Sequence, residues 1–248
     1  MKLLFIPNWN GHLYLQEYED KSVSKLYTGL DYKNKKLISI EKNNITKTNK
    51  IIQEEFSKEL RKENKGIISI TGDHSNSYSL IKSFSKKNKD FKLVIFDAHP
   101  DVEKTSDLVS HEDYLRNLIE GGVVKPENIY LFGIRTFSRV EFDYLIEKKV
   151  NFWTIVDLLK DKNKISRILK ELTGELYLSI DIDVLDPDFA PGTYYKEWCG
   201  LNLNELMEFI SILKDKVSAI DICEYYIEND TDEITFKNVL RLINLFLK

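Results

Sequence analysis

Short apolar runs alternate with longer amphipathic runs along this chain, and that alternation constrains its fold more than any other feature. The runs of strand length lie at residues 3–7, 36–40, 66–71, 92–96, 128–133, 151–153, 175–182 and 217–223. The segments with helical spacing lie at residues 45–62, 75–85, 112–120, 138–148, 155–172, 204–214 and 231–247. Buried strands that alternate with amphipathic helices predict an α/β fold with a mostly parallel sheet, covered on both faces.

Size and composition narrow the class of protein. The 248 residues contain no repeat and no Pro/Gly-rich linker, so we expect a single domain over residues 1–248. A formal net charge of −4 argues against a nucleic-acid partner. No run approaches the ~20 apolar residues that cross a membrane, and the apolar stretch near Met1 is too short for a signal peptide. Two cysteines without a secretory signal predict a cytoplasmic protein with reduced thiols.

Side chains that can bind metal follow the apolar run at 92–96. Asp97, His99 and Asp101 alternate in sequence, so in an extended chain they project to the same side. An ordinary polar loop is the alternative interpretation. However, Asp97 adjoins the uniformly apolar residues 93–96, where a carboxylate needs a partner, and two carboxylates that flank a histidine repel one another unless a cation intervenes. This segment therefore favours a metal site.

An acidic pair ends the strand predicted at 175–182. Asp181 and Asp183 share one face of an extended chain, whereas Ile180, Ile182 and Val184 share the other. A solvated loop would not interleave acids and branched apolar residues so regularly. This pair is therefore a second group of candidate ligands.

His74, in the segment GDHS at 72–75, follows the run at 66–71. By itself it is more typical of a cap or a surface residue than of a ligand. In a parallel sheet, however, ligands collect beyond the carboxyl ends of the strands, where all three segments lie. The six candidate ligands are His74, Asp97, His99, Asp101, Asp181 and Asp183.

A cluster of four aspartates and two histidines would be strongly repulsive without cations. Two divalent ions would neutralise it, and a carboxylate-rich set with some imidazole suits Mn²⁺ better than a metal that prefers thiolate. Two ions roughly 3.5–4 Å apart can share one water, lower its pKa and present it as a nucleophile. The sequence thus predicts a hydrolase with two metal ions.

Two further residues have open roles at this stage. His111 precedes the helix predicted at 112–120 and is compatible with a seventh ligand, a general acid or a structural helix terminus. Glu224 ends the apolar run at 217–223, where an unpaired carboxylate is costly. It could hold a cationic group of a substrate or pair with a Lys or Arg of its own chain.

The segments GDHS (72–75), DAHPD (97–101) and SIDIDVLDPDFAPGT (179–193) resemble, in this order, the three signatures of the ureohydrolase superfamily of arginase, agmatinase and formiminoglutamase. FGIR (132–135) and DICE (221–224) also resemble family segments, so the likeness covers residues 66–247. It implies an arginase-like three-layer α/β/α sandwich with a mostly parallel sheet of about eight strands. It also implies a homo-oligomer, a trimer or a hexamer.

The resemblance also implies a role for each site residue. The six candidate ligands would hold two Mn²⁺ ions, with Asp97, Asp181 and, as a further option, Asp101 serving both. His111 falls where the family has its catalytic histidine, and Asp101 could pass a proton toward the leaving amine. Glu224 falls where the family has the acid that grips a guanidinium group.

The reaction implied by the resemblance is attack of a metal-bridging hydroxide on a guanidinium carbon, which releases urea and a primary amine. Two alternatives stay open: hydrolysis of another C–N bond, such as a formimino group or an amide, and a non-catalytic metal-binding protein. A non-catalytic protein would be marked by the loss of a ligand or of His111, and none of these residues is lost.

Several departures from the family pattern concern the substrate rather than the metals. The loop at 101–111 lacks the Asn- and Gly-rich stretch that reads the α-groups of an amino acid, and residues 1–65 are unlike the usual family start. Tyr194, Tyr195 and Trp198 lie where relatives have a Pro/Gly-rich turn. These aromatic residues could line a wider entrance or contact a neighbouring subunit. We therefore expect an agmatine-like or other ω-guanidino substrate rather than free arginine.

Overall fold

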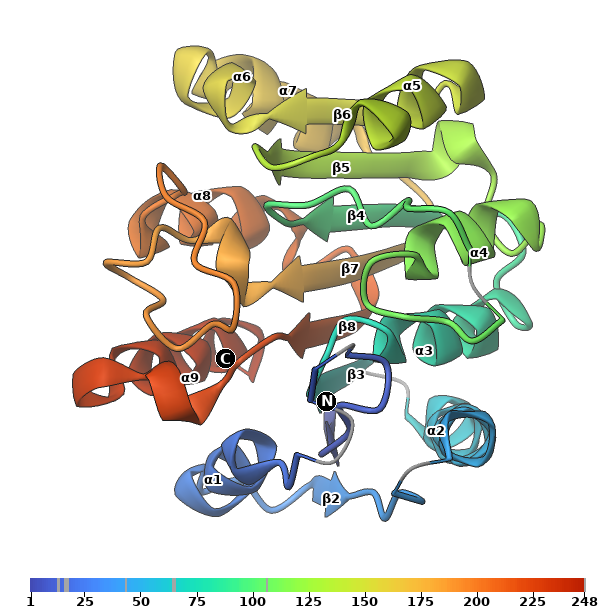
Figure 1. Ribbon diagram of the computed structural model, residues 1–248, viewed down its shortest axis with the longest axis vertical. Helices are drawn as coiled ribbons and strands as arrows, with labels where there is room; N and C mark the ends of the chain where they lie inside the picture. Colours follow the sequence, from blue (N-terminus) through green and yellow to red (C-terminus); the bar gives the residue numbers. More distant parts are fainter. Residues whose placement is uncertain (13, 16–17, 43, 64–65, 106, 248) are drawn as a thin grey trace.

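The computed structural model describes residues 1–12, 14–15, 18–42, 44–63, 66–105 and 107–247. In these ranges eight strands form one sheet in the order β2-β1-β3-β8-β7-β4-β5-β6, and every pairing is parallel (Figure 1). The strands are β1 (Lys2–Ile6), β2 (Lys35–Leu37), β3 (Ile67–Thr71), β4 (Lys92–Phe96), β5 (Ile129–Ile134), β6 (Asn151–Thr154), β7 (Leu176–Asp181) and β8 (Val217–Cys223). The predicted α/β fold with about eight strands is confirmed.

Helices cover both faces of the sheet and complete the three layers. They are α1 (Lys21–Gly29), α2 (Ile45–Lys62), α3 (Asn76–Ser85), α4 (Tyr114–Glu120), α5 (Arg139–Lys148), α6 (Ile155–Lys160), α7 (Lys162–Glu171), α8 (Leu203–Leu213) and α9 (Ile234–Leu247). Helices α2 to α5 contribute to one apolar cluster, and α1 with α6 to α9 contribute to the other, on opposite sides of the sheet (Figure 1). Strand residues alternate between the two clusters, as the period of two requires. Among the described residues, no helix has both the length and the apolar character needed to cross a membrane.

The segment predicted as one helix at 155–172 is instead two helices, α6 and α7. Asp161 separates them with an extended φ of −144°. Its backbone N–H donates to the Asp157 carbonyl and closes α6, while its carboxylate accepts the Lys164 N–H at 2.9 Å and opens α7. An Asp side chain competes in this way for backbone N–H groups, and the apolar periodicity does not register it.

Two further differences concern helix α1 and the end of β7. Helix α1 was not predicted because only Val23 and Leu26 supply its buried apolar face, although Asp20 caps it by accepting the Val23 N–H. Strand β7 ends at Asp181, and Ile182–Val184 form a single 3₁₀ turn rather than more strand. The predicted alternation of side chains between the two faces of the strand is therefore wrong beyond Asp181. The side chains of Asp181 and Asp183 nevertheless reach the same site.

The connectivity of the sheet places a crevice at its centre. Strand β3 precedes β4 in sequence, but β8 and β7 lie between them in the sheet. The chain thus changes direction across the sheet between β3 and β4, and such a reversal opens a crevice at the carboxyl ends of the strands. The segments that follow β3, β8, β7 and β4 all contribute to that crevice.

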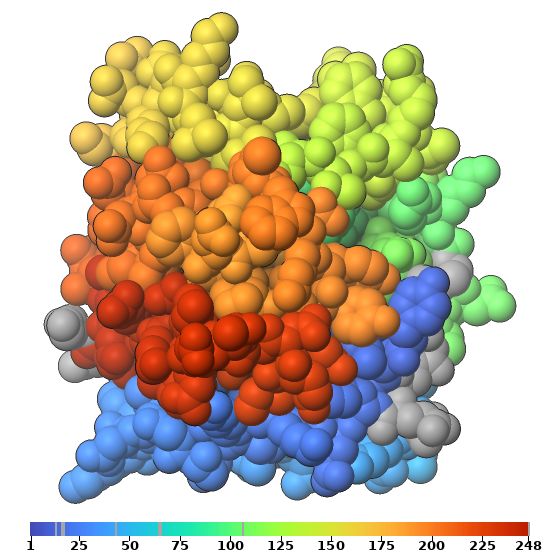
Figure 2. Space-filling model, turned by 60° about the vertical axis from the view of Figure 1, so that its left-hand side comes forward, coloured from blue at the N-terminus to red at the C-terminus, as the bar shows by residue number. Residues whose placement is uncertain are grey.

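Two long connections cover the crevice from outside. Figure 2 shows the N-terminal segment, in blue, adjoining the segment around residues 186–200, in orange, at the surface. Ring contacts join them, since Tyr194 packs against His12 at 4.5 Å between centroids and against Tyr14 at 6.5 Å. The cover of the crevice therefore includes two parts of the chain that depart from the family pattern, the N-terminal segment and residues 194–199.

Candidate metal centre and substrate pocket

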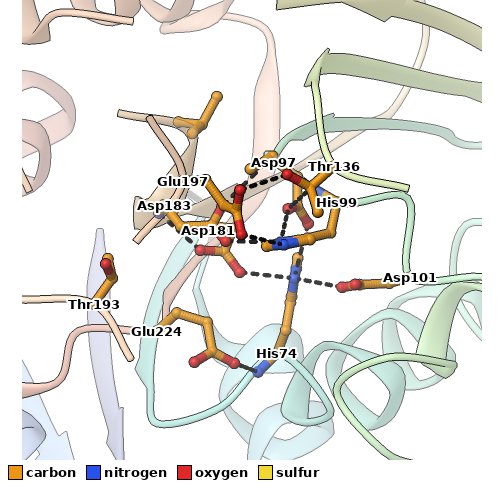
Figure 3. A network of polar contacts seen from close by, with 12 residues as sticks. His74, Asp97, His99, Asp101, Thr136, Asp181, Asp183, Thr193, Glu197 and Glu224 are labelled. Carbon is orange, nitrogen blue, oxygen red and sulfur yellow. Dashed lines mark hydrogen bonds and ion pairs between the residues drawn. The ribbon is translucent and has the colours of Figure 1, made fainter. Parts of the chain in front are cut away.

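His74 occupies the deepest part of the crevice, three residues after β3. Its Nδ1 lies 3.1 Å from a carboxylate oxygen of Asp97, 3.0 Å from one of Asp101 and 3.2 Å from one of Asp181 (Figure 3). A single ring nitrogen can bond one such oxygen well, not three. His74 Nδ1 and Asp97 Oδ2 are in fact buried without a hydrogen-bond partner. Buried ligand atoms that converge without bonding one another fit residues that hold a cation.

His99 forms the neighbouring group. Its Nδ1 lies 2.8 Å from Asp183 Oδ2 and 3.7 Å from Asp97 Oδ1. Asp97 therefore belongs to two compact groups, one with His74 and Asp101 and the other with His99 and Asp183. Its two oxygens face the two groups separately, which is the arrangement expected of a carboxylate that serves two ions. The structure brings all six predicted ligands together.

Burial and the repulsion between neighbouring acids both disfavour the charged forms of Asp181 and Asp101. Burial, followed by the charges of Asp183 and Asp97, raises the pKa of Asp181 well above its ordinary value. Burial and the charge of Asp97 raise the pKa of Asp101 to about 7. Asp101 also has a left-handed backbone with φ of 51°, which is uncommon for a residue other than Gly. Acids held at this density in a strained, buried site fit divalent cations as their neutralising partners.

A hydrogen-bond network behind His74 fixes its ring. His74 Nε2 lies 3.0 Å from the Ser179 hydroxyl, which donates to Asp221 at 2.6 Å. Tyr177 and Ser77 donate their hydroxyls to the same carboxylate, at 2.6 and 3.0 Å. Asp221 is thus fully occupied by hydroxyl donors and supports the ligand shell from behind, although it lies near enough to His74 to resemble a ligand itself.

Glu224 lies beside the metal cluster, one residue after β8. Its Oε1 accepts the backbone N–H of His74 at 2.7 Å, and its own backbone has φ of 64°. Among the described residues, no Lys or Arg forms an ion pair with it, which favours the interpretation as a site for an external cation over an internal ion pair. Burial, then the charges of Asp181 and Asp73, raises its pKa well above the ordinary value. A buried carboxylate that lines a cavity without a cationic partner can bind a cation from outside.

His111 lies in a turn before α4 rather than within the helix. It is 6 % exposed and lines the cavity, and its Nε2 is buried without a hydrogen-bond partner. Its Nδ1 lies 3.1 Å from the carbonyl oxygen of Gly11. His111 shares no compact ligand group with the six candidate ligands, so the geometry does not favour a seventh ligand.

A cavity of about 350 Å³ extends outward from these residues. Its wall includes Tyr194 and Tyr195, whereas Trp198 is 63 % exposed and does not contribute. The interpretation of these aromatic residues as an entrance thus holds for the two tyrosines and fails for Trp198. The described lining contains no Lys or Arg; the carboxylates that it adds beyond the metal ligands and Glu224 are Glu103, Glu112, Glu141 and Glu197.

Glu197 is a site residue that sequence reasoning missed. Its Oε1 lies 3.5 Å from His99 Nε2, and its Oε2 accepts the Thr136 hydroxyl. A carboxylate behind a metal-binding imidazole orients the ring and raises its basicity. The contact with His99 lowers the pKa of Glu197 despite partial burial. No motif marks this position, because only the path of the 186–200 segment brings it to His99.

Arg135, in the FGIR segment, fixes that path. Its guanidinium donates to the carbonyl of Glu197 at 2.9 Å, that of Trp198 at 3.1 Å and that of Gly133 at 3.3 Å. The charged N–H donors of Arg135 satisfy backbone carbonyls of an irregular loop, whose backbone groups have no regular strand or helix hydrogen bonds. Arg135 thereby explains the presence of the FGIR segment: it anchors the outer wall to the sheet.

A model of the arginase family matches residues 12–247. The chain belongs to the arginase family. The match begins well before residue 66, where the likeness seen in the sequence starts, and its first residue is His12.

Relatives and solved structures agree with this membership. The chain is 31 % identical over 171 residues to an agmatinase of Bacillus cereus, covering 67 % of this chain and 57 % of that protein. It is 33 % identical over 190 residues to an agmatinase of Halalkalibacterium halodurans, covering 73 % of this chain and 63 % of the relative. The matched region thus spans about three fifths of these relatives.

A crystal structure of formimidoylglutamase from Bacillus subtilis superposes with a TM-score of 0.87, over 99 % of this chain and 85 % of the other, at 21 % identity. At that identity the likeness concerns the fold. The arginase-family fold is therefore present over nearly the whole chain, including the region before β3.

Proposed function

We propose that this arginase-family chain is a two-metal amidinohydrolase that releases urea from a guanidino compound. Two Mn²⁺ ions would be held by the six converging ligands, with Asp97 reaching both. When bound, such a pair lowers the pKa of a shared water and so supplies the nucleophile. The observation that carries the proposal is that two compact ligand groups share Asp97 beside a buried carboxylate without a cationic partner.

Glu224 is the proposed anchor of the substrate. A guanidinium is planar and cationic, and its parallel N–H groups match a carboxylate through charge-assisted hydrogen bonds. Glu224 has one oxygen on the His74 N–H and lines the cavity next to the metal cluster. A bound cation would also relieve the cost of burying this charge.

Two residues are proposed to move the proton. His111 lines the cavity, its Nε2 makes no hydrogen bond, and this nitrogen would donate to the nitrogen that leaves as the amine. Asp101, whose carboxylate lies within the ligand cluster and lines the cavity, would carry the proton from the nucleophile toward that nitrogen. Breakage of the C–N bond then yields urea and a primary amine.

The outer cavity supports a substrate whose far end is cationic or neutral. A free amino acid, a guanidino acid or formiminoglutamate carries a carboxylate there, and the described lining offers no Lys or Arg to receive one. Glu103, Glu112 and Glu141 would instead attract an amine. Agmatine, a guanidinium joined to an amine by an apolar chain, fits this pattern, and hydrolysis of a formimino group or an amide fits it less well.

We further propose a cytoplasmic homo-oligomer, a trimer or a hexamer, with a small guanidino substrate and no nucleic-acid or membrane partner. Support comes from the family resemblance and the acidic charge balance. Light scattering of the purified protein tests the oligomeric state.

The experiment that tests the function measures urea from purified, Mn²⁺-reconstituted protein. The panel contains agmatine, arginine, guanidinobutyrate, guanidine and arginine-containing peptides, with formiminoglutamate and a simple amide as comparison. We expect agmatine to be the best of these substrates. Bound metal without urea from any of them would overturn the proposal, and release of ammonia or formamide alone would favour the other C–N hydrolases.

A further inference from the structure

A second histidine lies directly behind His111 and is outside the proposed chemistry. The rings of His12 and His111 are stacked, with 4.4 Å between centroids and 4° between planes. His12 is fully buried, and Tyr194 packs edge-on against its other side at 4.5 Å. The ring of His111 is therefore held flat against a rigid aromatic surface.

The neighbouring Gly11 determines which nitrogen of His111 carries hydrogen. The carbonyl oxygen of Gly11 lies 3.1 Å from His111 Nδ1 and also accepts the His111 backbone N–H at 3.2 Å. A carbonyl can only accept, so Nδ1 must be the donor. In the neutral ring the lone pair is then on Nε2, which is buried without a hydrogen bond and lies 3.9 Å from a carboxylate oxygen of Glu112.

The Gly11–His12 segment is itself fixed to the metal-binding region. The Gly11 N–H donates to the Asp73 carboxylate at 3.0 Å, and this carboxylate also accepts the Ser75 N–H at 2.9 Å. Asp73 and Ser75 are the two sequence neighbours of the proposed ligand His74. A side chain at position 11 has no room, because its Cβ would lie 2.0 Å from Ser75 Oγ. This contact explains why a Gly stands at position 11.

The geometry does not favour His12 as an acid or base itself, since its Nδ1 accepts the Tyr14 N–H at 3.2 Å and its ring does not line the cavity. Burial, followed by the charge of His111, lowers the pKa of His12 to about 3, so its ring stays neutral. A neutral, buried imidazole stacked on a proton-carrying one provides orientation without competing for the proton.

We propose that Gly11 and His12 act as a positioning pair that holds the plane and the Nδ1–H tautomer of His111. This inference rests on the proposed function, in which His111 Nε2 delivers a proton to the leaving amine. On delivery the Nε2–H bond breaks, the amine gains the N–H bond, and the hydrogen on Nδ1 remains with the Gly11 carbonyl. The orientation of His111 Nε2 toward the leaving amine then depends on the Gly11–His12 segment, about 100 residues away in sequence.

The test uses the chain's small number of histidines. With four in all, the imidazole ¹⁵N signals of the full-length protein, loaded with diamagnetic Zn²⁺, can be assigned by single replacements. The variants are His12→Ala, His12→Leu and His12→Phe; Phe keeps an aromatic surface, whereas Leu fills space without one. Thermal unfolding of each variant shows whether it folds.

We expect wild type and His12→Phe to show one His111 tautomer with hydrogen on Nδ1, and the Leu and Ala variants to show a mixture. With Mn²⁺ and agmatine, kcat should fall about 10-fold in the Leu and Ala variants with little change in KM, because general acid–base catalysis contributes roughly 10²–10⁴-fold and only part of it depends on aim. The Phe variant should recover most of kcat.

Folded Leu and Ala variants with the wild-type tautomer and kcat would overturn the inference. So would a Phe variant as impaired as Leu. If Ala does not fold, the comparison of Leu with Phe decides. If wild type releases no urea, the proposed function fails, while the tautomer signals still decide whether His12 positions His111.

Discussion

The metal cluster and the outer wall of the cavity are built on different principles. The cluster is made of residues at or just after the ends of β3, β4 and β7, and the hydrogen-bonded sheet sets their relative positions. The outer wall is made by residues of the 186–200 segment and of the loops that follow β4 and β5, and ring stacking on the N-terminal segment together with Arg135 holds the 186–200 segment in place. The difference teaches that the sheet fixes the positions of the candidate ligands, whereas contacts between loops shape the surface around them.

The largest effect is expected from the cluster itself. Asp181→Asn removes one charge from the site next to His74, so both bound metal and urea release should fall by more than the ~100-fold typical of losing an outer-shell partner. Metal analysis and the urea assay measure the two effects. Asp188→Asn, in the same segment but exposed, is the matched control and should retain both. Retained metal and activity in Asp181→Asn would contradict the assignment of ligands.

Glu224→Gln should separate substrate binding from metal binding. Removing one charge of a buried ion pair costs about 2–5 kcal/mol, so kcat/KM for agmatine should fall about 100-fold. The metal content should stay at the wild-type level, because Glu224 contacts the His74 backbone and not its ring. Glu233→Gln, on the surface, serves as control. Loss of metal in Glu224→Gln would mean that the two roles have been divided wrongly.

Glu197→Gln should have a smaller effect that links the two regions. It weakens the support of His99 alone, so affinity for one of the two ions should fall about 10-fold, as for other outer-shell partners. Mn²⁺ titration followed by calorimetry would resolve the two binding steps. Glu147→Gln, exposed on α5, provides the comparison. Equal weakening of both steps would argue for general disruption of the loop instead.

The smallest effect concerns stability and pH in the metal-free protein. Asp101 has a pKa of about 7 in the folded chain against an ordinary 3.8, so between these values the folded chain binds more protons than the unfolded chain. Its contribution to stability is therefore present at low pH and is lost as pH rises from about 4 to about 7.

Thermal unfolding across this range measures the effect. The decrease of stability with rising pH should be shallower in Asp101→Asn than in wild type. Mn²⁺ should offset the loss of stability above pH 7, because it binds the deprotonated ligands. The same slope in wild type and Asp101→Asn would show that Asp101 does not carry it.

The two regions also differ in how far the sequence predicts them. Asp97, His99 and Asp181 follow apolar runs, and a parallel sheet necessarily gathers the ends of such runs, so the cluster could be inferred before any coordinates. The 3₁₀ turn at Ile182–Val184 shows the limit of that inference, because the acids meet without the predicted alternation.

Glu197 and His12 could not be inferred in the same way. Each acts on a residue about 100 positions away, His99 and His111, through loops that have no periodic pattern. Tertiary contacts such as those of Arg135 with loop carbonyls decide where such loops lie. Helix α1 was missed for a related reason, since its polar composition hides two buried apolar residues behind an Asp cap.

The most direct test of the central proposal is the dependence of agmatine hydrolysis on Mn²⁺ stoichiometry. Metal-free protein would be titrated with Mn²⁺ while urea release is followed at saturating agmatine. We expect little urea without metal and a rate that reaches its plateau at about two ions per chain, as the two ligand groups that share Asp97 require. Full activity at one ion per chain, or no urea at any stoichiometry, would contradict a two-metal urea-releasing site.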